Sequence, residues 1–425
     1  MTDVIRRKMT VPLMVVGILG MVLLNTAYAE DEAAFDAHGG SNFIFEDGDM
    51  DFHFINLILG STTNGGVEIG EAFYVASQIK DGDSASWQKE WFEMAERVEK
   101  RGLKSLAEGH TVSARDQLLR AANYYRISLL GMTASNPEFK KRGMKCRELM
   151  KKAGPLFDPP LEYFEIPFEG AVLPGFFRKA NNSSKPNKTL IMIGGGETFI
   201  EDLFFYIAPQ AYARGYNFMA VDLPGQGMLP AEGKVFRTDN EVPMKAVVDY
   251  ALSRKDVDPK RLAAYGISGG GIFVPQAAEH DKRLKAIVVS SATVDGYALF
   301  AAMPAAASTE KERAGWSSFH GDIVKSICER YGVSADDPAG LIEANKGNTF
   351  DPTKITVPVL ILVGEGEYSS GEVQRQQKIV MDGLPNPAKE MIITPADEGA
   401  TNHCLMENRS LVGLVVFDWL DDILK

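Results

Sequence analysis

The chain has 425 residues, of which 45% are hydrophobic and 24% are charged, and its formal net charge is −12. This length exceeds that of one typical compact domain, so we expect a core with an appended region. The acidic balance argues against a nucleic-acid partner, which would require a basic surface. Three cysteines are too few for a disulfide framework, and no clustered His/Cys spacing indicates a metal site, so we expect neither a metal nor another cofactor.

The N-terminus is typical of an export signal. Basic residues (6–8) precede an apolar stretch (11–24) and an Ala-Tyr-Ala cleavage site (27–29). We therefore expect residues 1–29 to be a signal peptide and residues 30–51 to be a flexible lead-in. The mature protein is expected to be exported, periplasmic or secreted, with no stable membrane insertion after cleavage. The alternatives are an uncleaved anchor and a translation start at a later methionine.

Residues 52–154 show helical periodicity. Apolar side chains recur at three- and four-residue spacing, which predicts helices over 69–80, 84–101, 111–132 and 136–152. Pro137 directly after Asn136 is typical of a helix start. Since no strand pattern competes, the sequence predicts a helical domain of roughly 100 residues.

From residue 155 to residue 425 the pattern changes to short strands that alternate with helices. This alternation predicts an α/β fold with a mostly parallel sheet and helices on both faces. The predicted strands are 162–168 and 171–178 (a hairpin through Glu169-Gly170), 189–193, 217–221, 262–265, 286–290, 357–363 and 390–394. The predicted helices are 201–214, 242–253, 271–279 and 411–424.

One interval interrupts this alternation. More than about sixty residues between the strands 286–290 and 357–363 carry no strand signal, although a helix is predicted around 322–331. We expect an insertion at about 296–350 that covers the functional site from above. Together with the N-terminal helices, it supplies two candidate pieces of a lid.

Residues 266–270 read Gly-Ile-Ser-Gly-Gly, a G-x-S-x-G pattern between a predicted strand and a predicted helix. A serine on such a sharp turn exposes its oxygen at the end of a sheet, and small flanking residues make room for the turn. We interpret Ser268 as a catalytic nucleophile. The alternative is an ordinary strand-to-helix turn whose serine only caps the helix.

A serine nucleophile needs a base and an acid, which in this architecture follow it in the order acid, histidine. His403 follows the last predicted strand and is therefore expected at the same sheet edge as Ser268. Glu367 follows the next-to-last strand and is our candidate acid, with Glu365 as its competitor. We expect His320 to be an exposed histidine of the insertion or to line the pocket.

The remaining histidines receive no chemical role. His280 lies at the far end of the helix that Ser268 opens and is expected to point away, and three others precede the α/β region: His38, His53 and His110.

The developing oxyanion of acyl transfer needs two fixed N–H donors. We expect one from Gly269 and the other from Gly196, within the glycine run 194–196 that follows the strand 189–193. The run lacks the G-x-x-x-x-G-K-[ST] pattern of a phosphate-binding loop and does not fit the dinucleotide-binding pattern, so we discount both interpretations.

Several longer blocks resemble one known family. They lie in both halves of the chain and read Val67-Glu68-Ile69-Gly70-Glu71, Ser113-Ala114-Arg115-Asp116, Asp158-Pro159-Pro160, Pro174-Gly175-Phe176-Phe177, Asp222-Leu223-Pro224-Gly225-Gln226-Gly227, Asp256-Val257-Asp258-Pro259 and Glu398-Gly399-Ala400-Thr401-Asn402-His403-Cys404. Together they resemble the α/β-hydrolases of the group that holds the fungal yellowish-green pigment hydrolases, which shorten polyketides. The group also holds the bacterial 2,6-dihydroxypseudooxynicotine hydrolase and the FrsA-like esterases.

The resemblance implies a Ser-Asp-His hydrolase with an N-terminal helical lid, often a homodimer. Ser268 and His403 fall on the family's nucleophile and base, while Glu367 stands where the family usually has aspartate. The expected function is hydrolysis of a small-molecule substrate. The bond is either a C–C bond next to a ketone, in a polyketide-like or aromatic diketone, or a carboxylic ester. The alternatives are a non-catalytic binding protein on this fold and a peptidase of the prolyl-oligopeptidase type, which would predict a β-propeller where residues 52–152 show helical periodicity.

Aromatic and methionine side chains of the helical region would suit an aromatic substrate, although such residues are more often part of helix packing. They are Phe73, Tyr74, Tyr124, Tyr125 and Met132.

Overall fold

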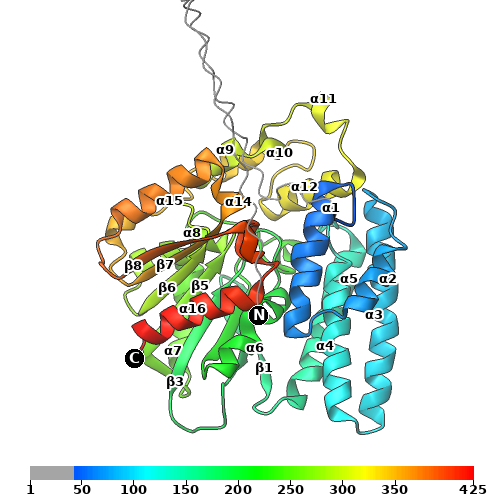
Figure 1. Cartoon of the computed structure of the whole chain (residues 1–425), viewed down its shortest axis with the longest axis horizontal. Helices are drawn as coiled ribbons and strands as arrows, with labels where there is room; N and C mark the ends of the chain where they lie inside the picture. The colour runs from blue at the N-terminus through cyan, green and yellow to red at the C-terminus, as the bar shows by residue number, and fades with distance from the viewer. Residues whose placement is uncertain (1–42) are drawn as a thin grey trace, which may run out of the picture. The chain divides into compact units, whose positions relative to one another are not determined.

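An eight-stranded sheet carries the strands in the order β1-β2-β4-β3-β5-β6-β7-β8 in this computed structural model, which describes residues 43–425 (Figure 1). β1 and β2 are antiparallel to their neighbours, and the strands from β4 to β8 are parallel. The predicted α/β fold with a mostly parallel sheet is confirmed. The predicted signal peptide lies outside the described residues, so export stays a prediction.

The strands have the following bounds: β1 (Leu161–Phe168), β2 (Ala171–Arg178), β3 (Asn187–Ile193), β4 (Asn217–Val221), β5 (Val257–Ile267), β6 (Ala286–Ser290), β7 (Val359–Gly364) and β8 (Lys389–Thr394). Each predicted strand is present. The strand before Ser268 begins earlier than its predicted core, because Val257 already pairs with Asn187 of β3 ahead of a shift in register. Glu169 (φ 43°) and Gly170 (φ 75°) form the predicted hairpin turn between β1 and β2, with the positive φ angles typical of two-residue hairpin loops.

The helices fall into three groups, in which η denotes a short 3₁₀ or π segment. Before the sheet lie α1 (Gly48–Phe52), η1 (His53–Ile58), η2 (Leu59–Asn64), α2 (Ile69–Ala76), α3 (Ser84–Ala107), α4 (Thr111–Ile127), α5 (Pro137–Ala153) and η3 (Gly154–Leu156). Among the strands lie α6 (Ile200–Ala213), η4 (Leu229–Glu232), α7 (Glu241–Ser253), α8 (Gly270–His280), α14 (Glu365–Tyr368), α15 (Gly371–Gly383), η6 (Ala396–Glu398), η7 (His403–Leu405) and α16 (Arg409–Ile423). The insertion holds α9 (Gly296–Ala302), α10 (Pro304–Ala307), α11 (Glu310–Arg313), α12 (Ser318–Arg330), α13 (Gly340–Ala344) and η5 (Pro352–Lys354).

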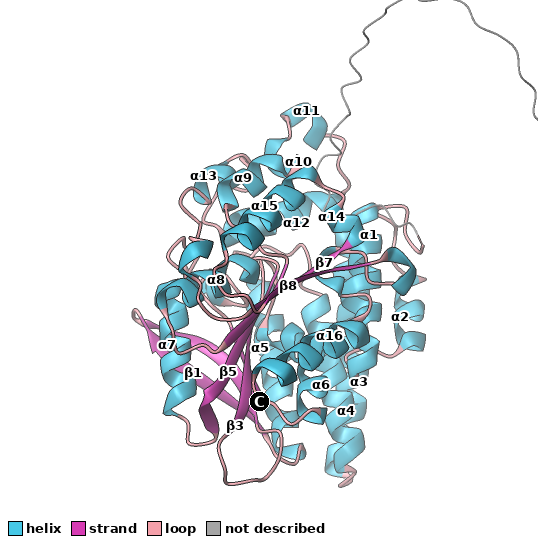
Figure 2. Cartoon of the chain, turned by 60° about the vertical axis from the view of Figure 1, so that its left-hand side comes forward, coloured by secondary structure: helices cyan, strands magenta, loops and turns pink. Residues whose placement is uncertain are grey.

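Both faces of the sheet are covered by helices, as Figure 2 shows. α6 and α16 pack together on one face, and α7 and α8 pack together on the other. Alternate residues of a strand point to opposite faces, so in β3 Leu190 and Met192 join the core under α6, while Ile191 and Ile193 join the core under α8. The strand sequence is therefore apolar throughout, as expected for a parallel sheet buried on both faces.

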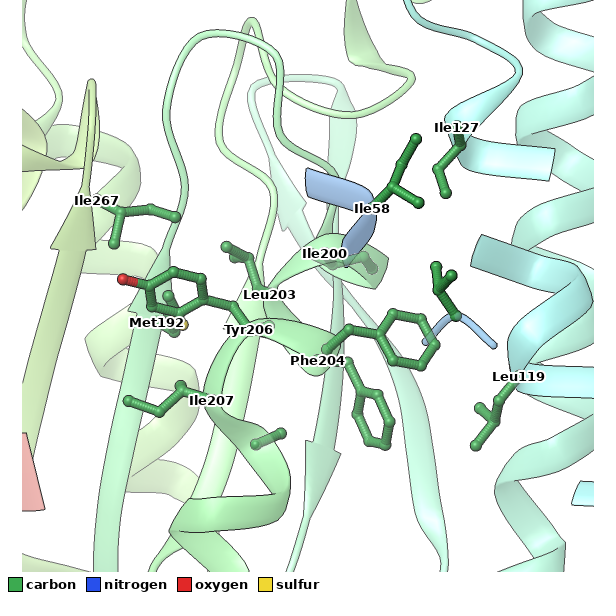
Figure 3. Close-up of a cluster of buried hydrophobic side chains, with 14 of the residues drawn as sticks. Ile58, Leu119, Ile127, Met192, Ile200, Leu203, Phe204, Tyr206, Ile207 and Ile267 are labelled. Atoms are coloured by element: carbon green, nitrogen blue, oxygen red, sulfur yellow. The ribbon is translucent and has the colours of Figure 1, made fainter. Parts of the chain in front are cut away.

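The helices before the sheet share a hydrophobic core with it. Figure 3 shows Ile58, Leu119 and Ile127 of the helical region facing the side chains of α6, behind which Met192 of β3 lies. All of these side chains belong to one buried cluster. The predicted helices exist, but the predicted boundary near residue 154 does not separate two hydrophobic cores, because α6 is apolar on both sides.

The predicted lead-in is wrong for residues 43–51. These residues include most of α1, and the buried carboxylate of Asp51 accepts hydrogen bonds from the N–H groups of Ile44 (2.8 Å) and Phe45 (3.0 Å). The short polar side chains that suggested a loose segment instead cap the helix, since Asp47 accepts from the N–H of Met50 at 2.8 Å. Between residues 43 and 425, no helix combines the length and apolar character needed to span a membrane.

Candidate active site

Ser268 lies on the turn between β5 and α8. Its φ of 54° is in the left-handed region, which a non-glycine residue seldom adopts. The chain can turn this sharply because Gly266 has no side chain: a Cβ there would lie 2.0 Å from the carbonyl oxygen of Gly270. The N–H of Ser268 donates to the carbonyl of Ser290 at 2.6 Å and so fastens the turn to β6. The hydroxyl is thereby held at the carboxyl edge of the sheet.

The structure brings the predicted nucleophile, base and acid together. His403 Nε2 lies 3.0 Å from Ser268 Oγ, and His403 Nδ1 lies 2.8 Å from Glu367 Oε1. Because a carboxylate accepts, Nδ1–H donates to Glu367, which leaves Nε2 free to accept the hydroxyl proton of Ser268. The competitor Glu365 is engaged elsewhere and accepts from the N–H of Ala396 at 2.8 Å.

Two loops that carry the acid and the histidine are joined through Thr401. Its hydroxyl accepts from the N–H of Gly366 at 2.8 Å, and its carbonyl accepts from the N–H of Glu367 at 3.3 Å. The Glu407 carboxylate accepts from the N–H of Thr401 at 2.6 Å. These contacts fix the backbone on both sides of the pair formed by Glu367 and His403, so the orientation of the imidazole depends on the loops as well as on the carboxylate.

A buried tyrosine network supports the histidine loop from within the core. Tyr206 donates to the carbonyl of Cys404 at 2.7 Å, its hydroxyl lies 3.1 Å from that of Tyr265, and Tyr265 lies 2.8 Å from the hydroxyl of Ser290. Cys404 has a φ of 60°. The network thus links the backbone next to the base with the strand that fastens the serine turn.

Burial and charge act on the acid and the base in opposite directions. Burial alone would raise the pKa of Glu367, but the neighbouring imidazole holds the pKa of this carboxyl below its usual range. Burial alone would lower the pKa of His403, but its interactions with Cys404 and Glu367 outweigh this effect and raise the pKa of the imidazole. Glu367 is therefore an anion that stabilises the charged form of His403, as a base in acyl transfer requires.

The glycine run lies directly against the serine. A Cβ built on Gly195 would fall 2.3 Å from the Cβ of Ser268 and 2.9 Å from the nitrogen of Gly269, whereas a Cβ on Gly196 would meet nothing within 4 Å. Gly196 and Gly269 both line the cavity next to Ser268. Within residues 43–425, neither of their N–H groups donates a hydrogen bond to the chain. Gly195, which the sequence did not single out, is the residue that permits this close approach.

Ser268, Glu367 and His403 line a cavity of about 1100 Å³. The predicted insertion covers it, since its apolar side chains form a large part of the wall: Leu299, Phe300, Met303, Trp316, Ile323 and Ile327. The segment from Asp47 to Leu57 contributes another part. His320 lines the cavity too and contacts Asp49, while His280 lies at the far end of α8 and bonds to the carbonyl of Gln276.

None of the five aromatic or methionine residues considered for substrate contact lines this cavity. Tyr124, Tyr125 and Met132 are buried in helix packing, and Phe73 and Tyr74 are exposed on α2.

Comparison with known proteins finds relatives and a structural neighbour that are named as hydrolases. The chain is 34% identical over 263 residues to the 20-hydroxy-prefusarin hydrolase of Gibberella moniliformis, which covers 59% of this chain and 62% of that protein. It is 29% identical over 395 residues to the alpha/beta hydrolase pydG of Acremonium sp, which covers 84% and 91%. The 2,6-dihydroxy-pseudo-oxynicotine hydrolase has the same fold, with a TM-score of 0.68 at 22% identity over 86% of this chain and 95% of that one. The chain therefore has the α/β-hydrolase fold, and the relatives that it resembles are named as hydrolases. This confirms the resemblance seen in the sequence.

Two further findings bear on the activity of this chain. A family profile described as X-Pro dipeptidyl-peptidase (S15 family) matches residues 132–322, a stretch that contains Ser268 but neither Glu367 nor His403. The chain also spans only about three fifths of the length of the prefusarin hydrolase and 57% of the alpha/beta hydrolase gkaG of Penicillium citrinum. The fold and the named relatives therefore do not identify the bond that is cleaved, and we propose it from the site.

Sequence reasoning missed polar groups in the wall of this cavity, among them His53 and Glu197. His53, to which we had assigned no role, is buried in the cavity wall, where its Nε2 lies 3.6 Å from Glu197 Oε2. Glu197 directly follows the glycine run, which offers a weak signal of proximity to the serine. For His53 the sequence offers no such signal, because more than 200 residues separate it from Ser268.

Proposed function

We propose that the protein is a serine hydrolase with a Ser268-Glu367-His403 triad, which cleaves either a C–C bond next to a ketone or a carboxylic ester in a small molecule. The observation that carries this proposal is the hydrogen-bonded chain from Glu367 through His403 to Ser268, at 2.8 and 3.0 Å, in the wall of a large cavity. A serine without such a chain is a poor nucleophile at neutral pH.

In the proposed reaction, Ser268 Oγ attacks the substrate carbonyl while His403 Nε2 takes the hydroxyl proton. The N–H groups of Gly196 and Gly269 stabilise the oxyanion, and Glu367 stabilises the imidazolium. Collapse of the tetrahedral intermediate expels the leaving group and gives an acyl-enzyme. Water activated by His403 then releases the acid and restores the serine. Apart from water and the substrate, these steps use only groups that line the cavity.

The cavity supports a bulky, largely apolar substrate. Its wall from the insertion is formed by aliphatic and aromatic side chains, and a volume of about 1100 Å³ exceeds the needs of a short-chain ester. One relative is named as a hydrolase of 20-hydroxy-prefusarin, and one structural neighbour is named as the 2,6-dihydroxy-pseudo-oxynicotine hydrolase. We therefore propose a polyketide-like or aromatic diketone as the substrate class, with an ester of similar size as the alternative.

Covalent labelling tests the nucleophile. A fluorophosphonate probe is expected to label the wild-type protein once, and Ser268→Ala is expected to abolish both the label and turnover. Ser308→Ala is the matched control, because Ser308 lines the same cavity within the insertion. Persistent labelling of the Ser268→Ala protein would show that another residue is the nucleophile.

A second candidate function is removal of an X-Pro dipeptide, which the match to the S15 peptidase profile favours. The triad chemistry would be the same, and only the substrate differs. A panel that combines p-nitrophenyl esters, aromatic β-diketones and Xaa-Pro p-nitroanilides discriminates the candidates. Preferred cleavage of the β-diketones is the result that we expect, and preferred cleavage of the anilides would replace it by the peptidase function.

A further inference from the structure

The wall of the cavity holds a second acid–base pair, formed by His53 of η1 and Glu197 of the glycine-rich loop. His53 Nε2 lies 3.6 Å from Glu197 Oε2, and the two side chains are 7% and 22% exposed. Both line the cavity that holds Ser268. The triad mechanism of the proposed function uses neither residue.

This pair holds a proton. His53 Nδ1 lies 2.7 Å from the carbonyl oxygen of Asp49, and because a carbonyl only accepts, Nδ1 carries a hydrogen. A bare Nε2 would turn its lone pair toward the carboxylate of Glu197 at 3.6 Å, so this geometry favours a protonated Nε2. Burial opposes the charged imidazole, but the nearby carboxylates of Glu197 and Asp49 outweigh it and raise the pKa of His53.

The pair lies close to the reacting serine. Gly195, whose Cα is 3.3 Å from a Cβ built on Gly269, is separated from Glu197 by one residue. Since consecutive Cα atoms are about 3.8 Å apart, the Cα atoms of Gly195 and Glu197 are at most about 7.6 Å apart. The loop is held in place by Arg126, which donates to the carbonyl of Glu197 at 2.7 Å. A proton on His53 therefore lies in the wall of the cavity that Gly196 and Ser268 also line.

The two bonds that the proposed function leaves open differ in their need for such a proton. A p-nitrophenyl ester expels a stable phenolate, which departs without protonation. A β-diketone expels an enolate, a much stronger base, whose departure is helped by a proton donor at its carbon or oxygen.

We propose that His53, held protonated by Glu197, donates the proton to the enolate fragment that leaves when a β-dicarbonyl substrate is cleaved. This rests on the proposed serine-hydrolase function and selects C–C cleavage within it. Glu197 acts as a positioning residue, since it acts through His53 and need not touch the substrate.

The proton and electron balance is complete. The Ser268 Oγ–C bond forms as His403 takes the serine proton, and the C–C bond then breaks with its electron pair passing to the enolate, which takes the Nε2 proton of His53. Transfer of the proton on His403 to His53 through water restores both imidazoles. In deacylation, water gives a proton to His403 and its hydroxide to the acyl carbon, and the proton then returns to the departing serine oxygen. The net reaction adds one water across the C–C bond.

The test compares two substrates in two variants. For His53→Gln and Glu197→Gln, kcat/KM on an aromatic β-diketone is expected to fall about 10²- to 10⁴-fold, the usual contribution of general acid catalysis. Turnover of p-nitrophenyl acetate is expected to stay close to that of the wild type. Glu197→Gln provides an independent test if His53→Gln does not fold. The amide keeps the size of the side chain but lacks the negative charge that favours protonated His53.

A control variant distinguishes loss of proton donation from loosened packing of the segment η1–η2, which carries His53. Asn64 of the adjoining η2 donates to the carbonyls of Phe205 (2.8 Å) and Tyr206 (2.9 Å) and does not line the cavity. Asn64→Ala therefore loosens the same segment without touching the pair, and we expect it to leave the ratio of diketone to ester turnover unchanged.

Three outcomes would overturn the inference: an equal loss on both substrates in the variants, an unchanged diketone rate in them, or no cleavage of any β-diketone by the wild type. The proposed serine-hydrolase function has a separate test. It fails if ester turnover survives Ser268→Ala, whatever the variants of His53 show.

Discussion

Replacement of Gly195 by alanine tests how closely the glycine-rich loop must approach the serine. The added Cβ would lie 2.3 Å from the Cβ and 2.6 Å from the Oγ of Ser268, whereas carbon atoms in contact are normally about 3.5 Å apart or more. The loop and the serine turn must therefore separate by about 1 Å. Neither can yield easily, because Ser268 N–H is bonded to Ser290 and the loop is held by Arg126.

A displacement of about 1 Å at a reacting group can lower the rate about 10²-fold, and loss of one oxyanion donor lowers it about 10²- to 10³-fold. We therefore expect Gly195→Ala to lower kcat/KM on p-nitrophenyl acetate by about 10²- to 10³-fold. Gly196→Ala is the matched control: its Cβ meets nothing within 4 Å, and its N–H is retained. Steady-state kinetics on the small ester, together with thermal unfolding of both variants, measure the difference. A Gly195→Ala enzyme of near wild-type activity, or an equal loss in Gly196→Ala, would refute the reasoning.

Further predictions concern charge at the site and in the core. Glu367→Gln removes the carboxylate that helps raise the pKa of His403, so the acid limb of the pH–rate profile is expected to shift to lower pH. We also expect kcat to fall roughly 10⁴-fold. An acid limb that stays in place would show that Glu367 does not raise the pKa of His403. Arg147→Met leaves Glu201 buried without its partner and is expected to reduce the free energy of unfolding by about 3–5 kcal/mol in urea titrations. Arg97→Met, at an exposed ion pair, is the control and should cost less than about 1 kcal/mol, so similar losses in both would argue against a role for burial.

The sequence predicted the local elements because their signals are local. Apolar spacing identified the helices, and the alternation of strands with helices identified the parallel sheet. Asn136 caps α5 by accepting from the N–H of Glu138 at 3.0 Å, with Pro137 in the first turn, as the pattern indicated. The triad candidates could be named because chain order in this architecture places them at the ends of successive strands.

The choice between Glu365 and Glu367 was beyond the sequence, because two carboxylates two residues apart differ only in the direction of a loop. The hydrogen bonds of Thr401 to that loop aim Glu367 at His403.

Taken alone, the sequence determined the strand order along the chain, the serine turn and the edge of the sheet at which a base and an acid would meet. Tertiary structure decided which carboxylate reaches the base, that Gly195 abuts the serine, that the N-terminal helices share the core of the sheet, and that His53 faces Glu197. The physical reason is the range of the interactions: periodicity and turn chemistry act between neighbours in the chain, whereas these contacts join segments that only folding brings together.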